Sequence, residues 1–121
     1  MRTLIIADDS ELIRTELKRI LKSEPQIQLL GEAVCFQDAI DKVADLRPDV
    51  LLLDLHMPDD RVLTLDYIQS QFQAHPVKIV AMSLSGEDDK ETRDIAETLG
   101  ACKVLEKSRI NRDLIPAVLN C

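Results

Sequence analysis

The chain has 121 residues, of which 45% are hydrophobic and only 2% aromatic. This length suits one domain, so we expect residues 1–121 to form a single unit with a core of Leu, Ile, Val and Ala. The net charge of −7 and the absence of a Lys/Arg-rich run argue against direct binding to nucleic acid or to a membrane surface. The sequence contains no apolar run of membrane-spanning length and no signal peptide, which favours a cytoplasmic location.

Cys35, Cys102 and Cys121 form no CxxC motif and no pattern typical of a disulfide framework or a zinc site. We therefore expect three reduced thiols.

Short apolar runs alternate with segments of helical periodicity along the chain. The apolar runs predict strands at residues 3–7, 27–33, 50–53, 77–82 and 102–105. The first helix should begin after a cap at Ser10, the second should end before Pro48, and the third should cover residues 63–73. A fourth should follow a turn at residues 86–88 and stop at Gly100, and a fifth should start late or bend at Pro116.

This strand–helix alternation, repeated five times, predicts an α/β fold with a doubly wound parallel sheet. Strand–helix–strand units in one sheet take right-handed crossovers. We expect the five-stranded, flavodoxin-like strand order 2-1-3-4-5, in which strands one and three are neighbours. Ligands in such folds bind beyond the carboxyl ends of the strands, where the strand order reverses.

Acidic residues follow the two neighbouring strands at this point. Asp8 and Asp9 come after the first strand, and Asp54 comes after the third. Three carboxylates that converge there repel one another unless a cation joins them. Mg²⁺ suits a site with few carboxylates, several waters and a phosphate oxygen. The pattern therefore predicts a magnesium site.

Ser83 and Lys107 follow the fourth and fifth strands. A hydroxyl and an ammonium beside a carboxylate–metal cluster can hold a phosphoryl group. Each residue alone has a simpler interpretation, because Asp8 and Asp9 can cap a helix, Ser83 can occupy a turn and Lys107 can be a solvated charge. Their arrival at the same end of four strands favours a shared site.

At these residues the sequence resembles the receiver family of bacterial two-component response regulators, over essentially its whole length. The resemblance rests on the Asp8-Asp9 pair, the segment LLLDLHMP at residues 51–58, Ser83, the run Leu99-Gly100-Ala101, and Lys107.

The resemblance implies a role for each residue of the site. Asp54 would accept the phosphoryl group, and Ser83 and Lys107 would contact it. Mg²⁺ would be held by the carboxylates of Asp9 and Asp54 and by the backbone carbonyl of His56, while Asp8 would hold the metal's waters. Such a domain catalyses only its own phosphorylation and dephosphorylation, so it is not an enzyme with a separate substrate.

The resemblance also implies partners. The phosphoryl donor would be a phosphohistidine on a sensor histidine kinase or a phosphotransfer protein, and the resulting switch would act on a downstream effector. Ile13 matches a position at which family members touch the donor protein, and it could equally be a core residue. The pair Lys107-Ser108 resembles a subgroup whose receivers often precede a helix-turn-helix output domain.

Several positions depart from the family pattern. The family usually has a glycine that opens the third helix, where this chain has Asp59, Asp60 and Arg61. It usually has an aromatic switch residue where this chain has Val104. Leu84 replaces a small residue directly after Ser83, so it either covers the mouth of the site or packs under the fourth helix. These departures spare the phosphorylation site and concern the output mechanism.

Three rival functions can be weighed on the same residues. A phosphatase of the haloacid-dehalogenase class needs a second Asp where His56 stands. A flavodoxin-like electron carrier needs aromatic and glycine residues, and the chain has only one Tyr, two Phe and three Gly. A pseudo-receiver would keep the fold and signal by protein interaction without phosphate. Asp9, Asp54 and Lys107 argue against this last alternative, whereas Val104 and Leu84 leave it open.

Overall fold

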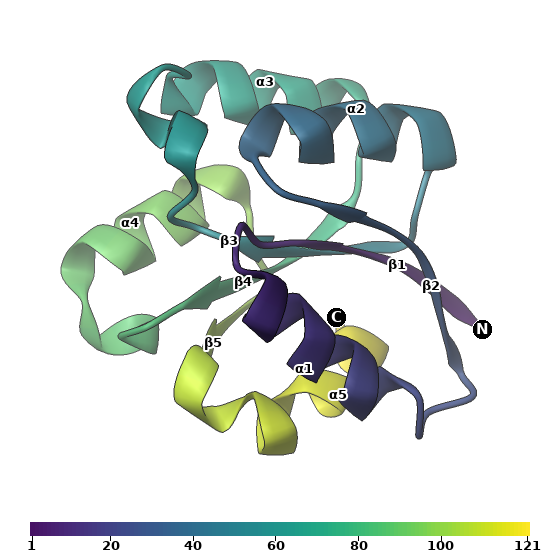
Figure 1. Cartoon of the computed structure of the whole chain (residues 1–121). Helices are drawn as coiled ribbons and strands as arrows, with labels where there is room; N and C mark the ends of the chain where they lie inside the picture. The colour runs from purple at the N-terminus through teal and green to yellow at the C-terminus, as the bar shows by residue number, and fades with distance from the viewer.

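A computed structural model describes residues 1–121, apart from the side chain of Glu87. Within this described chain, five strands alternate with five helices (Figure 1). The strands are β1 (Arg2–Ala7), β2 (Ile27–Ala33), β3 (Val50–Asp54), β4 (Lys78–Ser83) and β5 (Lys103–Glu106). The helices are α1 (Glu11–Leu21), α2 (Phe36–Leu46), α3 (Leu65–Ala74), α4 (Lys90–Leu99) and α5 (Ile110–Asn120). Short 3₁₀ turns cover Pro58–Arg61, Gly86–Asp88 and Lys107–Arg109.

All strand pairs are parallel, and the sheet order is β2-β1-β3-β4-β5. The predicted fold class and strand order are therefore confirmed. In the central pair, Ala7 of β1 lies opposite Leu53 of β3. The residues that follow these two strands consequently emerge side by side at one edge of the sheet.

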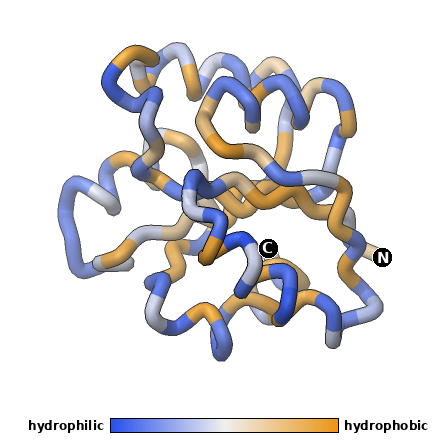
Figure 2. Tube along the Cα trace, viewed as in Figure 1, coloured by the Kyte–Doolittle hydropathy of each residue, from blue (hydrophilic) through white to orange (hydrophobic). Residues whose placement is uncertain are grey.

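The sheet separates two apolar layers. Helices α2, α3 and α4 pack on one face, and α1 and α5 pack on the other (Figure 1). Strand β3 is buried along its whole length, with Leu51 and Leu53 in the first layer and Val50 and Leu52 in the second. Figure 2 shows the same division, with hydrophobic strands at the centre and hydrophilic residues along the helices. Ile13 of α1 packs against the second layer, as its interpretation as a core residue predicts.

The segment before α3 differs from its prediction. The helix begins at Leu65 rather than at residue 63, because the side chain of Thr64 accepts a hydrogen bond from the backbone of Tyr67 and caps the helix. Asp59, which stands where the family usually has glycine, accepts hydrogen bonds from the backbone N–H groups of Phe36 and Gln37, each at 2.9 Å. This loop is therefore held against the first turn of α2.

Pro116 does not delay α5, which begins six positions earlier at Ile110. The proline is exposed, so the backbone donor that it lacks lies on the solvent side of the helix. Among the described residues, no helix has the length and apolar character needed to cross a bilayer.

The expectation of three reduced thiols was wrong for two of them. Cys102 and Cys121 form a disulfide, with their Cα atoms 6.0 Å apart, and Cys35 is free. The two residues are 19 positions apart and meet because α5 folds back along β5. Sequence spacing does not show such a contact, since it arises from the packing of a strand against a helix.

Candidate functional site

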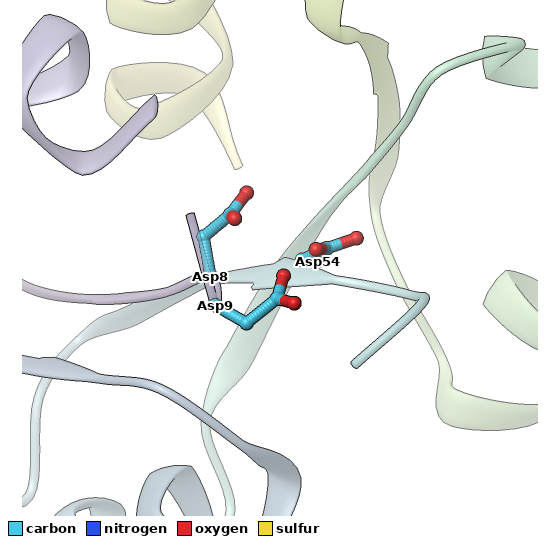
Figure 3. Close-up of side chains that lie close together, drawn as sticks. All are labelled: Asp8, Asp9 and Asp54. Carbon is cyan, nitrogen blue, oxygen red and sulfur yellow. The ribbon is translucent and has the colours of Figure 1, made fainter. Parts of the chain in front are cut away.

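Three carboxylates gather beyond the ends of β1 and β3. One oxygen from each of Asp8, Asp9 and Asp54 lies within 4.8 Å of the others. Figure 3 shows the three side chains together, with the carboxylate of Asp8 turned to a different side from those of Asp9 and Asp54. Asp8 and Asp54 are buried, at 0% and 2% exposure, whereas Asp9 is exposed. The structure therefore brings together the acidic residues that the sequence predicted.

The turn between β1 and α1 fixes Asp8. Its backbone N–H donates to the carbonyl of Ala33 at 3.0 Å, and its Oδ1 accepts from the backbone N–H of Ser10 at 2.8 Å. The hydroxyl of Ser10 in turn accepts from the N–H of Ile13 and caps α1. The simpler interpretation of this segment as a helix cap thus holds for Ser10, and Asp8 remains directed into the site.

Lys107 reaches the cluster from the 3₁₀ turn after β5. Its Nζ lies 2.9 Å from Oδ2 of Asp8 and 3.2 Å from Oδ2 of Asp54, and its side chain is 13% exposed. Burial alone would lower the pKa of this ammonium, but the two carboxylates outweigh burial and raise it. Lys107 is therefore a charged group between two buried anions.

The negative charge of Asp54 is only partly neutralised by its neighbours. Burial raises the pKa of its carboxyl from 3.8 to about 6, and the neighbouring charge of Asp8 adds to this rise. The backbone N–H of His56, which donates to Oδ1 at 3.0 Å, and the ammonium of Lys107 act in the opposite direction. The ionised form of Asp54 thus gains stability from any further positive charge placed beside it.

Ser83 lies at the end of β4, next to the strand that carries Asp54. The hydroxyl is buried and accepts a hydrogen bond from the backbone N–H of Gly86 at 2.7 Å. Leu84, which follows it, is 80% exposed, so the idea that Leu84 packs under α4 was wrong. The side chain of His56 is also exposed.

Sequence analysis did not single out Arg14, whose guanidinium donates to the backbone carbonyl of Asp8 at 2.8 Å. The residue lies on the first part of α1, five positions after Asp9. Its partner on β2 is Glu32, 18 residues further along the chain. Only the tertiary fold reveals this connection.

The residues of the cluster fit a hard divalent cation. All the side-chain ligand atoms are carboxylate oxygens, which Mg²⁺ prefers. Oδ2 of Asp8 is buried and, apart from its ion pair with Lys107, has no hydrogen-bond partner among the described residues. A buried oxygen of this kind has lone pairs left for a cation or for waters around one.

Comparisons with known proteins show the family to which the chain belongs. The family model for the response regulator receiver domain matches residues 4–119. The chain therefore belongs to the response regulator receiver family. It is 41% identical over 104 residues to a protein-glutamate methylesterase/protein-glutamine glutaminase of Methanosarcina mazei, and 36% identical over 108 residues to one of Hydrogenovibrio crunogenus. These matches cover 85% and 89% of this chain but only 28% of each relative, so this receiver chain spans less than a third of their length.

Solved receiver structures share the fold. The response regulator domain of Thermotoga maritima CheB aligns with a TM-score of 0.84 over 99% of this chain and 95% of that one, at 22% identity. The signal receiver domain of the putative response regulator NarL from Mycobacterium tuberculosis aligns with the same TM-score over 99% and 94%, at 24% identity.

The raised pKa of Asp54 predicts how stability depends on pH in metal-free buffer. In the native state the pKa of Asp54 is about 6, so the carboxyl keeps its proton up to about pH 6, whereas in the unfolded chain it loses the proton near pH 3.8. This group therefore stabilises the fold below pH 3.8, and that contribution is lost as the pH rises to about 6. Asp54→Asn removes the titration. Since one pKa unit corresponds to about 1.4 kcal/mol, the variant should be more stable than the wild type by roughly 2–3 kcal/mol at about pH 8.

Urea unfolding across this pH range, with a chelator present, measures the difference. The gain should shrink to nothing below about pH 4, where both states of the wild type hold the proton. Asp45→Asn, at an exposed carboxylate, serves as the control. A difference between Asp54→Asn and the wild type that is the same at every pH would contradict the assignment.

Proposed function

We propose that residues 1–121 form one receiver domain that accepts a phosphoryl group on Asp54 in a Mg²⁺-dependent reaction. The observation that carries this proposal is the ammonium of Lys107, held 2.9 Å from Asp8 and 3.2 Å from Asp54 at the switch point of a parallel sheet. A carboxylate nucleophile whose charge is only partly neutralised, an acidic cluster and a cationic side chain are the groups that phosphoryl transfer requires.

Asp9 and Asp54 would hold Mg²⁺ through their carboxylates and His56 through its backbone carbonyl, while the carboxylate of Asp8 would hold the metal's waters. When bound, Mg²⁺ would neutralise carboxylate charge and draw electron density from a phosphoryl oxygen. Two cationic groups would then face the three carboxylates, and repulsion within the cluster would fall.

In the transfer step, a carboxylate oxygen of Asp54 forms a bond to phosphorus as the bond between phosphorus and the donor histidine nitrogen breaks. The electron pair of that bond stays on the departing imidazole. Lys107 exchanges its contact with Asp54 for one with a phosphoryl oxygen, and Ser83 turns its hydroxyl toward the same group. The protein supplies position and charge, which is most of the catalysis in such in-line transfers.

The partners follow from this chemistry. The donor is a histidine kinase or a histidine phosphotransfer protein in the cytoplasm, and the altered surface acts on an effector. The length of the methylesterase/glutaminase relatives beyond the matched region is consistent with an effector in the same polypeptide. The domain binds neither nucleic acid nor a membrane directly, in keeping with its charge of −7. The complete acidic cluster favours this function over a pseudo-receiver.

Incubation with acetyl phosphate and Mg²⁺, followed by mass spectrometry, tests the proposal. The wild type should gain the mass of one phosphoryl group, and Asp54→Asn should gain none, because the amide lacks the anionic oxygen that attacks phosphorus. Omission of Mg²⁺ should abolish the gain in the wild type. Undiminished labelling of Asp54→Asn would place the acceptor elsewhere.

Leu84 directly follows Ser83 and its side chain is exposed, so we infer that it lies over the mouth of the site and lengthens the lifetime of the phosphorylated state. A branched apolar group beside the site hinders the in-line approach of water and of small donors alike. Leu84→Ala should therefore accelerate both phosphate loss and uptake from acetyl phosphate several-fold, as timed by mass spectrometry. The control is Leu46→Ala, which removes a different exposed leucine at the end of α2. Unchanged rates in Leu84→Ala would contradict the idea that Leu84 hinders access to the site.

A further inference from the structure

Asp9 occupies an unusual position within the acidic cluster. Its carboxylate is exposed and makes no hydrogen bond or ion pair with the described residues, whereas Asp8 and Asp54 are held by several partners. A ligand without side-chain partners takes its direction from the backbone to which it is attached. The peptide group between Asp8 and Asp9 therefore sets the position and the Cα–Cβ direction from which the Asp9 carboxylate extends.

Arg14 holds that peptide group. Its Nη1 donates to the carbonyl oxygen of Asp8 at 2.8 Å, and this carbonyl belongs to the peptide that joins Asp8 to Asp9. Its Nε donates to Oε1 of Glu32 at 3.1 Å, and the arginine side chain is only 15% exposed. One rigid, planar guanidinium thus connects β2 to the turn that carries Asp8 and Asp9, which we call the acidic turn.

The far end of this connection is itself fixed. Oε2 of Glu32 accepts from Nζ of Lys18 at 3.1 Å, so both carboxylate oxygens of Glu32 are used. Glu32 directly precedes Ala33, whose carbonyl accepts the N–H of Asp8. Both sides of Asp8 are consequently attached to the end of β2, its N–H directly and its carbonyl through Arg14.

We propose that Arg14 is a positioning residue. Its hydrogen bonds to Asp8 and Glu32 orient the Asp8–Asp9 peptide and thereby direct the carboxylate of Asp9 toward a divalent cation. This inference rests on the proposed function, because it concerns the same cation. It adds a residue on α1, outside the acidic cluster, to the group that determines the affinity of the site.

The direction in which removal of Arg14 changes the affinity for Mg²⁺ separates a positioning role from a purely electrostatic one. The guanidinium is a positive charge close to the cluster, so as a charge alone it repels a cation, and its removal would tighten Mg²⁺ binding. As a positioning residue it preorganises a ligand, and its removal loosens Mg²⁺ binding. Loss of a group that orients a metal ligand typically costs about 10- to 100-fold in affinity.

Calorimetric titration with Mg²⁺ alone, on the full chain, tests the proposal. Arg14→Ala should raise the dissociation constant about tenfold. Arg14→Lys should raise it by a similar factor, because the ammonium keeps the charge but cannot bridge Asp8 and Glu32. The matched control is Arg19→Ala, an arginine on the same helix that pairs with Glu16 and has no contact with the acidic turn; its affinity should equal that of the wild type.

Thermal unfolding without Mg²⁺ measures the purely structural effect of each variant. If Arg14→Ala fails to fold, Arg14→Lys and Glu32→Gln, which retain most of the packing, decide the question. Wild-type affinity in these folded variants, or tighter binding in Arg14→Ala, overturns the positioning role even if the midpoint falls. No Mg²⁺ binding by the wild type itself would overturn the proposed function, and with it this inference.

Discussion

The ammonium of Lys107 forms ion pairs with two carboxylates that the fold has removed from water. Asp8 and Asp54 are almost completely buried, and a buried carboxylate without a partner is strongly unfavourable. With the exposed Asp9 included, three negative charges face one positive charge, which leaves a formal excess of two at this edge of the sheet. Burial is the main cause of the raised pKa of Asp54, and the neighbouring charge of Asp8 adds to the rise. The arrangement is suited to a divalent cation, whose charge equals the deficit.

The same arrangement explains how a change at Asp54 can reach other parts of the molecule. Ser83 holds the N–H of Gly86, which has a left-handed backbone with a φ of 61°. A Cβ on this glycine would lie 3.1 Å from the Cβ of Glu106, so the loop after β4 rests closely on the end of β5. Since Val104 cannot act as an aromatic switch, this contact joins the ion pairs of Lys107 in connecting the site to the end of β5. A hydroxyl that turned toward a phosphoryl group would release the N–H of Gly86.

The sequence sufficed for the sheet and for the acidic cluster because both follow from local pattern and topology. Apolar runs mark the strands, and a residue at the end of a parallel strand must emerge at the ligand-binding edge. Prediction failed where a contact depends on the packing of remote segments. The disulfide between Cys102 and Cys121 requires α5 to lie along β5, and the caps provided by Thr64 and Asp59 depend on the course of one loop. The role of Arg14 likewise depends on the place of β2 beside β1.

This edge of the sheet is short of positive charge, and we propose that Mg²⁺ supplies it. A ligand that binds only the native state stabilises it by about 2.7 kcal/mol at a concentration 100 times its dissociation constant. The direct measurement is the thermal unfolding midpoint as a function of Mg²⁺ concentration, in the wild type and in Asp9→Asn. The midpoint should rise by several degrees with Mg²⁺ in the wild type and much less in Asp9→Asn. A midpoint that does not change with Mg²⁺ in the wild type would contradict this proposal.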